Sequence, residues 1–312
     1  MGNLRGSLLM VAAMFGFALE DMLIKQMAGA MPMGQVLALI GAGGMINFAV
    51  LARLKGHRIL SSAFLSTPVL LRNLGEVIAS ASFITALVLT TLSSASAILQ
   101  ATPLAVTLGA ALFLGEPVGW RRWAAIAVGF AGVMLIIQPG LGGFAPASLL
   151  AVVAVAALAL RDLASRRIPA EITGLQLATW AFASLVPTGA IMMIAFGEPA
   201  VMPAPPDIVR LAAAFVVGGC GYYAIVGATR TGDVAVVVPF RYTRLIFAMI
   251  LGAVIFGERP GWLMLVGAAL IVGAGLYTIG REAGLARQAR RRPVAVPDPE
   301  PVRSRDAVEC ET

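Results

Sequence analysis

The stretch Gly115-Glu116-Pro117-Val118-Gly119-Trp120 returns later in the chain as Gly257-Glu258-Arg259-Pro260-Gly261-Trp262. The two glycines, the glutamate and the tryptophan that the copies share all lie at one constant spacing, which takes Gly115 to Gly257 and Trp120 to Trp262 and is called the repeat spacing below. Each copy ends one apolar segment and begins another that is rich in small residues. Four identities at one spacing indicate an internal duplication, so the chain is interpreted as two related halves.

Composition sets the class of protein. Of the 312 residues, 59% are hydrophobic and 12% are charged, and the mean hydropathy is +0.89, far above that of soluble domains. Apolar runs of about 20 residues, the length that crosses a bilayer as a helix, recur along the chain. They lack the alternation of a strand barrel. The sequence therefore predicts an all-α polytopic membrane protein.

Ten transmembrane helices are expected, five in each half. Because five is odd, the second half must enter the membrane in the opposite sense, which gives two inverted five-helix repeats. The first repeat is residues 1–138, the second is 139–280, and a basic, proline-rich tail at 281–312 is expected to be disordered. The predicted spans are residues 6–27, 34–54, 69–91, 95–114, 120–137, 147–163, 172–196, 208–229, 234–256 and 262–278.

Loop charge predicts the orientation. Lysine and arginine gather in alternate connections and in the tail, and such connections face the cytoplasm. With the N-terminus inside, the outer connections hold only Lys25, Arg210 and Arg259. Both termini are therefore expected in the cytoplasm of a bacterium whose inner membrane the chain crosses many times. The net charge of +7 is assigned to orientation and to contact with anionic lipid, not to nucleic acid.

Several kinds of chemistry find no support in the residues. Cys220 and Cys310 do not make a disulfide or a metal site, and His57 is the only histidine. No phosphate-binding glycine loop of an ATPase is present. No histidine lies in a span, and no pair of aspartates lies deep in the membrane. We therefore expect no enzyme, no cofactor and no metal.

The repeated pattern resembles a known family. An apolar run with Pro103, then Gly115-Glu116, a Gly-Trp pair and a helix rich in Gly and Ala, in two copies over ten spans, is similar to the EamA-type drug/metabolite transporter superfamily. The resemblance covers residues 5 to 280, and in size the chain resembles the YddG-like amino-acid exporters. It implies a central cavity lined mostly by helices 1 to 4 and 6 to 9. The second half departs from the pattern, because Leu245 stands at the repeat spacing from Pro103 and the proline of that half is Pro239.

Ionisable residues inside spans are candidates for function, because burying them in a membrane is costly. Glu76, Arg241 and Arg244 are expected at one depth, about 10 to 15 Å from the cytoplasmic side at 1.5 Å per helical residue. A carboxylate, a cation and aromatic rings at one level suit a zwitterionic solute with an apolar side chain. The predicted substrate-binding residues are Glu76, Trp180, Tyr222, Tyr223, Arg241, Arg244, Gln100 and Asn73.

Each candidate also has a structural explanation. Glu76 can pair with Arg72 or with an arginine of the ninth helix, and the aromatic residues can serve in packing. Asp21 can reach Lys25 four residues later in an outer-edge salt bridge, although it or its neighbour Glu20 can instead bind a proton or an ammonium group. The repeated glutamates are expected to stabilise helix N-termini.

Proline and small residues point to architecture. Pro103, Pro187 and Pro239 interrupt spans and are predicted hinges. Small-residue runs in the fifth and tenth helices are expected to form scaffold or a homodimer surface.

The function predicted from the sequence is export of small metabolites, most of all amino acids including hydrophobic and aromatic ones, by alternating access between the two halves. The partners are then a small-molecule solute and the lipid bilayer. The alternatives are export of another organic solute such as a nucleobase, sugar conjugate or drug, a channel, and an intramembrane enzyme.

Overall fold

The computed structural model of the chain describes residues 2–59, 62–116, 119–140, 144–169 and 171–291. Within these residues ten helical segments are long and apolar enough to cross a membrane, and β-structure is limited to one isolated bridge between Ala28 and Met31. The ten predicted spans are therefore confirmed. Pro117 and Val118 of the first repeat motif lie outside the described residues.

Eight of the spans are single helices: α1 (Gly2–Gln26), α2 (Met33–Leu54), α3 (Thr67–Leu89), α6 (Trp120–Ile137), α7 (Ser148–Ser165), α8 (Gly174–Phe196), α9 (Pro205–Thr231) and α12 (Trp262–Arg291). The fourth span consists of α4 (Leu92–Leu99) and α5 (Thr102–Phe113). The ninth consists of α10 (Val234–Val237), η2 (Val238–Tyr242) and α11 (Thr243–Phe256), and a short turn, η1 (Ser62–Leu65), precedes α3.

One boundary differs from the prediction. The tail was expected to be disordered from residue 281, but α12 continues to Arg291. The reason is local, since residues 281–291 are rich in alanine and arginine, which favour helix, and the first proline comes only at Pro293. Residues 292–312 lie outside the described residues.

The two repeat motifs have the same backbone structure. The amide of Glu116 donates to the carbonyl of Ala110 over 3.3 Å, and the amide of Glu258 donates to the carbonyl of Gly252 over 3.0 Å. The glycine before each glutamate has a left-handed φ, 65° in the first copy and 64° in the second. Glycine adopts this conformation without steric cost, which explains why both helices end at a glycine.

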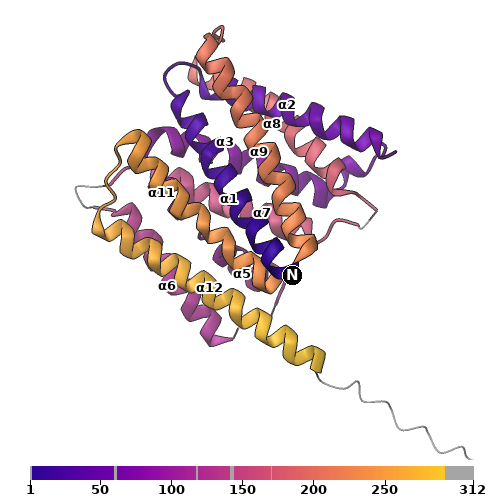
Figure 1. Cartoon of the computed structure of the whole chain (residues 1–312), viewed down its shortest axis with the longest axis vertical. Coiled ribbons are helices and arrows are strands. Elements are labelled where there is room, and N and C mark those ends of the chain that lie inside the picture. The colour runs from indigo at the N-terminus through magenta and orange to yellow at the C-terminus, as the bar shows by residue number, and fades with distance from the viewer. Residues whose placement is uncertain (1, 60–61, 117–118, 141–143, 170, 292–312) are drawn as a thin grey trace, which may run out of the picture.

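Helix packing follows the same two-fold relationship. In the repeat, α1 corresponds to α7 and α9 corresponds to α3. Accordingly α1 packs against α9, and α7 packs against α3. The α1–α11 contact is likewise matched by the α7–α5 contact. The equivalent helices α2 and α8 pack on each other, as do α6 and α12, and these two pairs form opposite edges of the bundle (Figure 1).

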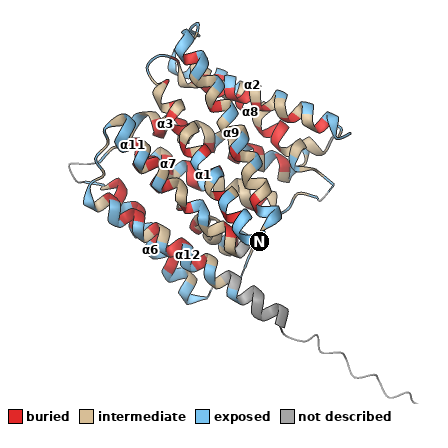
Figure 2. Cartoon of the chain, viewed as in Figure 1, coloured by how far each residue is buried: buried red, intermediate tan, exposed pale blue. Residues whose placement is uncertain are grey.

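The helices α6 and α12 run antiparallel and approach closely. A Cβ atom on Gly132 would lie 2.6 Å from the carbonyl oxygen of Gly267, and one on Gly267 would lie 2.5 Å from that of Gly132. Near the start of α6, Gly119 lies beside Arg281, toward the end of α12. The small residues of α6 and α12 thus pack these two helices of one chain against each other, which is the predicted scaffold role. Buried residues lie where helices meet, and exposed ones at helix ends and outer surfaces (Figure 2).

The connections alternate between two ends of the bundle. At the end that holds the start of α1, here named the terminal face, the amide of Asp233 donates to Asn3 Oδ1 over 2.9 Å. Also at this face, Gln176 Nε2 donates to the carbonyl of Arg58 over 2.7 Å.

The other end of the bundle is named the opposite face. There Gln35 exchanges two hydrogen bonds with the backbone of Val201, at 2.7 and 3.0 Å. Trp120 begins α6 at the terminal face, and Trp262 begins the antiparallel α12 at the opposite face. The second half is therefore inverted relative to the first, as the odd number of spans predicted.

The two broken spans meet at their breaks. The fourth span is interrupted after Leu99, one turn before Pro103, and the ninth changes from 3-10 to α-helix at Tyr242. Gln100, which corresponds to Tyr242 at the repeat spacing, donates from Nε2 to the carbonyl of Arg241 over 3.2 Å. Helices 4 and 9 are therefore equivalent even though their prolines are not. Pro187 lies inside α8, which stays continuous.

Candidate functional site

The most enclosed ion pair joins the two halves. Arg244 on α11 donates to Asp21 Oδ2 on α1 from Nη2 over 2.6 Å and from Nε over 3.2 Å. The side chains are 20% and 6% exposed. The sequence predicted that Asp21 pairs with Lys25, and this was wrong. Packing of α11 against α1 brings a guanidinium to the carboxylate, and an arginine fork can satisfy it with two bonds.

Aromatic rings flank this pair. The guanidinium carbon of Arg244 lies 5.5 Å from the ring centroid of Phe17 and 5.8 Å from that of Phe83. Both distances are in the range of cation–π attraction. Glu20 lies next to the pair, and a Cβ atom on Gly218 would come within 2.6 Å of its carboxylate. A cation, two carboxylates and two rings are thus gathered in one place between α1, α3 and α11.

Lys25 serves a different purpose from the one predicted. Its ammonium donates to the carbonyl of Leu87 over 2.7 Å and to that of Thr90 at the end of α3. It also lies 5.5 Å from the ring centroid of Phe256. Lysine near a helix C-terminus stabilises the unpaired carbonyls there.

A second ion pair lies between α3 and α7. Arg161 Nη1 and Glu76 Oε2 are 3.4 Å apart, and Arg161 also donates from Nε to Asp162 Oδ1 over 2.9 Å. The sequence offered Arg72 or an arginine of the ninth helix as the structural partner of Glu76, and both were wrong. Gly75 explains the contact, because a Cβ there would lie 2.9 Å from the Arg161 amide nitrogen, so α3 approaches α7 closely at this level.

Arg72 binds its own helix neighbour and the next helix. Its Nη1 donates to Asn73 Oδ1 over 3.2 Å and to the carbonyl of Leu177 on α8 over 3.3 Å. Asn73 is buried, and within the described part of the chain its Nδ2 has no hydrogen-bond partner. An unsatisfied buried donor is unfavourable by about 1–3 kcal/mol, so Asn73 is available to an acceptor on a ligand or a water.

Arg241 differs from the other interior cations. It is exposed, and no acceptor is recorded for its guanidinium within the described residues. It lies in electrostatic range of Asp162, Arg161 and Arg244, and so between the two ion pairs. Its N–H donors are therefore available to a solute.

The predicted tyrosines form part of an aromatic cluster. Phe48 lies 4.8 Å from Tyr222, 6.3 Å from Tyr223 and 5.4 Å from Phe182 between ring centroids. Tyr222 is also in electrostatic range of Arg72. The rings connect α2, α8 and α9, and Tyr223 is 45% exposed.

Trp180 lies apart from these groups. It is 5% exposed, its Nε1 donates to the carbonyl of Ile59 over 2.9 Å, and Phe64 packs edge-on against its ring. It therefore fixes the α2–α3 connection at the terminal face. Arg244, by contrast, pairs with Asp21, about 28 Å along α1 from its start at 1.5 Å per residue. The predicted single layer was wrong, because the ninth span is broken and its α11 part packs against α1.

The repeated glutamates have separate partners. Glu258 accepts hydrogen bonds from the backbone amides of Leu92 at 2.6 Å and Ser93 at 3.0 Å, the first residues of α4. It thus stabilises a helix N-terminus, as predicted, but one in the other half. Glu116 pairs with Arg166 at 3.0 Å, with both side chains about half exposed.

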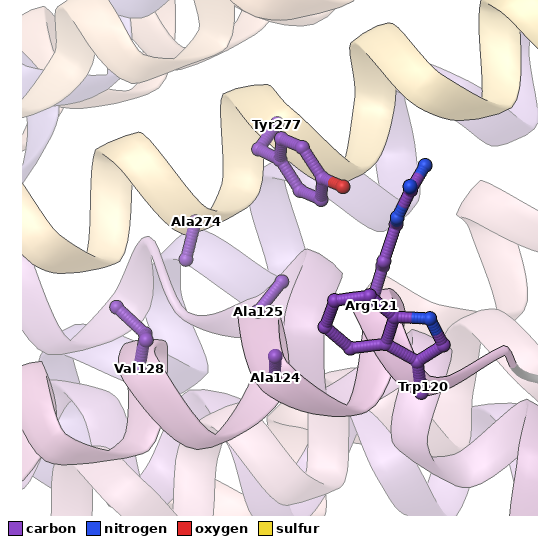
Figure 3. A pocket seen from close by; sticks show the side chains of 7 residues that line it. All are labelled: Trp120, Arg121, Ala124, Ala125, Val128, Ala274 and Tyr277. Atoms are coloured by element: carbon purple, nitrogen blue, oxygen red, sulfur yellow. The ribbon is translucent and has the colours of Figure 1, made fainter.

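Two of the apolar hollows in the described part of the chain lie between helices away from the ion pairs. One runs between α6 and α12, and Arg121 stacks over Trp120 at its end, 5.5 Å from the ring centroid (Figure 3). An exposed tryptophan at a helix end is typical of a membrane interface. The other is lined by α5, α6 and α7, including Leu108, Phe130 and Leu160. Among the described residues no group of His, Cys, Asp and Glu is arranged to hold a metal.

The sequence contained a signal for Arg161 and Asp162, which were not among the predicted site residues. At the repeat spacing, Glu20 corresponds to Asp162 and Lys25 to Arg167. Both halves therefore carry adjacent charges at the same level of their first helix. Comparison of the halves position by position would have marked the Arg161–Asp162 pair as a candidate.

Inverted halves, broken spans that meet, and ion pairs buried between them define a multi-pass membrane protein of the transporter class. The chain belongs to the EamA-like transporter family, which matches it twice, over residues 4–138 and 145–280. The chain is a transporter and not an enzyme.

Individual relatives have more specific names. The chain is 30% identical to a protein of Rhizobium johnstonii named riboflavin transporter, over 89% of this chain and 91% of that protein. It is 27% identical to a Rickettsia bellii protein named S-adenosylmethionine uptake transporter, over 61% and 64% of the two chains. A crystal structure at 23% identity, covering 89% of this chain and 98% of the other, has a TM-score of 0.54 and shows the shared fold.

Proposed function

We propose that this protein is a secondary transporter of a bacterial inner membrane that moves a small organic solute by alternating access. The inverted halves support this, because exchange of their conformations converts access from one face into access from the other. Basic residues on the connections of the terminal face, such as Arg53, Arg58 and Arg121, support a cytoplasmic position for both termini.

The solute class that we propose is a flat heteroaromatic compound, with riboflavin as the first candidate. The observation that carries this proposal is the closeness of the Arg244 guanidinium carbon to two aromatic rings, 5.5 Å from the ring centroid of Phe17 and 5.8 Å from that of Phe83. A flat ring can stack on such side chains, and its carbonyl groups can accept N–H donors. The full-length similarity to a protein named riboflavin transporter supports the same class.

The groups around Arg244 offer donors as well as surfaces. Asp21 accepts from Nε and Nη2 of Arg244, and no acceptor is recorded for Nη1 among the described residues. Arg241 lies within electrostatic range on the same span. A carbonyl or carboxylate of the solute would accept from these open N–H groups while its ring contacts Phe17 or Phe83.

The second candidate is export of amino acids, including hydrophobic and aromatic ones. It is favoured by the carboxyl group of Glu20 in electrostatic range of the Arg244 guanidinium, since a zwitterion presents an ammonium and a carboxylate together. A solute that combines a zwitterion with a heteroaromatic ring, as S-adenosylmethionine does, would use both features.

Flux into liposomes tests the proposal. Purified protein is reconstituted, and uptake of riboflavin, S-adenosylmethionine and phenylalanine is measured with and without unlabelled solute inside. A carrier for the flat class gives saturable riboflavin flux that internal riboflavin accelerates. Flux of phenylalanine alone would favour the amino-acid candidate, and flux that neither saturates nor responds to counterflow would indicate a channel.

A homodimer remains a prediction of the sequence. Native mass spectrometry of the protein released from lipid nanodiscs measures the mass of the assembly directly. A single mass equal to one chain would contradict it.

A further inference from the structure

The side chain of Glu258 attaches the α11–α12 connection to the start of α4 at one end of the bundle. Its Oε1 accepts from the amide of Leu92 over 2.6 Å, and its Oε2 accepts from the amide and the hydroxyl of Ser93 over 3.0 and 2.7 Å. Three hydrogen bonds to one carboxylate make a specific attachment. They tie the α11–α12 connection of the second half to the broken span of the first half at the opposite face.

Neighbouring groups strengthen this closure. Lys25 of α1 donates to the last carbonyls of α3 and lies in electrostatic range of Glu258. Directly beside these polar contacts, Met27, Leu87 and Leu92 are completely buried in one apolar cluster. The ends of α1, α3 and α4 are therefore held together at the opposite face.

Backbone hydrogen bonds show which residues of the other half correspond to this attachment. The amide of Thr90 donates to the carbonyl of Ala86, and at the repeat spacing the amide of Gly232 donates to that of Ala228. The next helix begins in the same way in both halves, with the amides of Ala95 and Val237 bonded to residues 91 and 233. The repeat spacing thus holds throughout this region.

At this spacing Glu116 corresponds to Glu258, and Val234 and Ala235 correspond to Leu92 and Ser93. The equivalent attachment would lie at the terminal face, where the contact recorded for the Glu116 carboxylate among the described residues is a different one. Glu116 instead accepts from Arg166 over 3.0 Å with its side chain 46% exposed.

The cation behaves in the same way. Arg167, which corresponds to Lys25, is exposed at the terminal face, and among the described residues no hydrogen bond from it to the end of α9 is recorded. Both members of the attachment are therefore engaged at one face and disengaged at the other. In a molecule of two inverted halves, the two access states are related by exchange of conformation between the halves. In the second state, the first half would therefore have the contacts that the second half has here, and the reverse.

We propose that Glu258 and Glu116 are alternating latches: Glu258 on α4 holds the opposite face shut in the conformation described here, and Glu116 on α10 holds the terminal face shut in the other. The inference rests on the proposed alternating access. The pivot of each latch is the break in the span that it holds, at Gln100 in the first half and at Tyr242 in the second.

Cysteine pairs can report each latch separately. In a background with Cys220→Ser and Cys310→Ser, one variant carries Ser93→Cys with Glu258→Cys, and the other carries Ala235→Cys with Glu116→Cys. Both are treated in liposomes with the same short bifunctional thiol reagent and scored by gel mobility after protease cleavage in the α6–α7 connection. We expect both pairs to react, each to lock one face, and counterflow to stop after either reaction.

The two reactions must exclude each other. A variant with all four cysteines is expected to give molecules with one cross-link or the other and none with both. Molecules with both cross-links, or a second pair that never reacts while solute flux is intact, would overturn the latch. The gel readout needs no flux, so mutually exclusive cross-links without riboflavin or amino-acid flux would leave the latch standing and reject the proposed solutes.

The hydroxyl of Ser93 allows a graded comparison, because its counterpart is alanine. Ser93→Ala removes one of the three contacts and keeps both amide contacts, so its effect on the closure is expected to be smaller than that of Glu258→Gln. Glu258→Gln removes the charge, and we expect faster labelling of a cysteine at Ala95, which is 1% exposed beneath the latch, by a membrane-impermeant maleimide. Unchanged labelling in Glu258→Gln would contradict the proposed closure.

Discussion

Arg244 and Asp21 form a buried ion pair although 223 residues separate them in the chain. One residue lies on the first helix and the other on the broken span of the second half. The pair therefore couples the two repeats at the place where rings and a second carboxylate also gather. Its strength and its contribution to transport can be measured separately.

The first prediction concerns the coupling energy of this pair. Asp21→Ala leaves a cation buried without its partner, which should destabilise the fold by about 3–5 kcal/mol. The double change Asp21→Ala with Arg244→Ala should be less destabilising than the sum of the single changes. Denaturant unfolding in detergent measures all three variants.

A surface ion pair serves as the reference for these variants of Asp21 and Arg244. Arg166→Ala breaks the half-exposed contact with Glu116 and should alter stability by about 0–1 kcal/mol. A loss for Asp21→Ala as small as that for Arg166→Ala would mean that the interior pair is hydrated and weak.

The second prediction separates binding from folding at Arg241. Its guanidinium is exposed and has no recorded partner, so Arg241→Gln should leave the unfolding midpoint nearly unchanged. We expect solute flux to fall by about tenfold, which corresponds to about 1.4 kcal/mol. Arg121→Gln, an exposed arginine at the outer edge, is the control and should transport normally. Full flux in Arg241→Gln would remove that residue from the site.

The third prediction tests the solute class through Phe83. Replacement by leucine keeps an apolar side chain but removes the flat ring beside Arg244. Loss of an aromatic contact is worth about 0.5–1.5 kcal/mol beyond buried area, so the KM for riboflavin should rise by about two- to tenfold. Competition by aliphatic amino acids should not change. An equal effect on both solute classes would show that Phe83 only supports packing.

The fourth prediction concerns the close approach of α6 and α12. Gly132→Ala places a methyl group 2.6 Å from a carbonyl oxygen, so the helices must separate. Such overpacking should destabilise the protein by about 1–3 kcal/mol. Gly273→Ala on the same pair of helices meets nothing within 4 Å and should be neutral or stabilising. Thermal unfolding of both variants in one detergent decides whether the contact is as tight as described.

The fifth prediction concerns Trp180, the predicted ligand on α8 that the structure places against the α2–α3 connection. Trp180→Phe loses the hydrogen bond to Ile59 and should lower stability by about 1 kcal/mol. The KM for the solute should stay the same, because the ring lies beneath the α2–α3 connection. A large rise in KM without loss of stability would return Trp180 to the binding site.

The sequence by itself determined the spans, the inversion and the equivalence of the two Gly-Glu motifs. These features depend on local properties. About 20 apolar residues must satisfy their backbone hydrogen bonds within a helix to cross a membrane, and a glycine at the end of a helix can turn left-handed. The repeat at one spacing then fixed which elements correspond, such as Glu116 and Glu258.

Only the tertiary structure decided which charges pair. Depth counted along a straight helix placed Arg244 with Glu76 and Trp180, whereas Arg244 pairs with Asp21 and Glu76 with Arg161. The choice depends on which helices pack together, on the broken ninth span, and on glycines that let particular helices approach. Which charges pair depends on distances of a few ångströms between helices. The hydropathy pattern of a single helix contains no information about those distances.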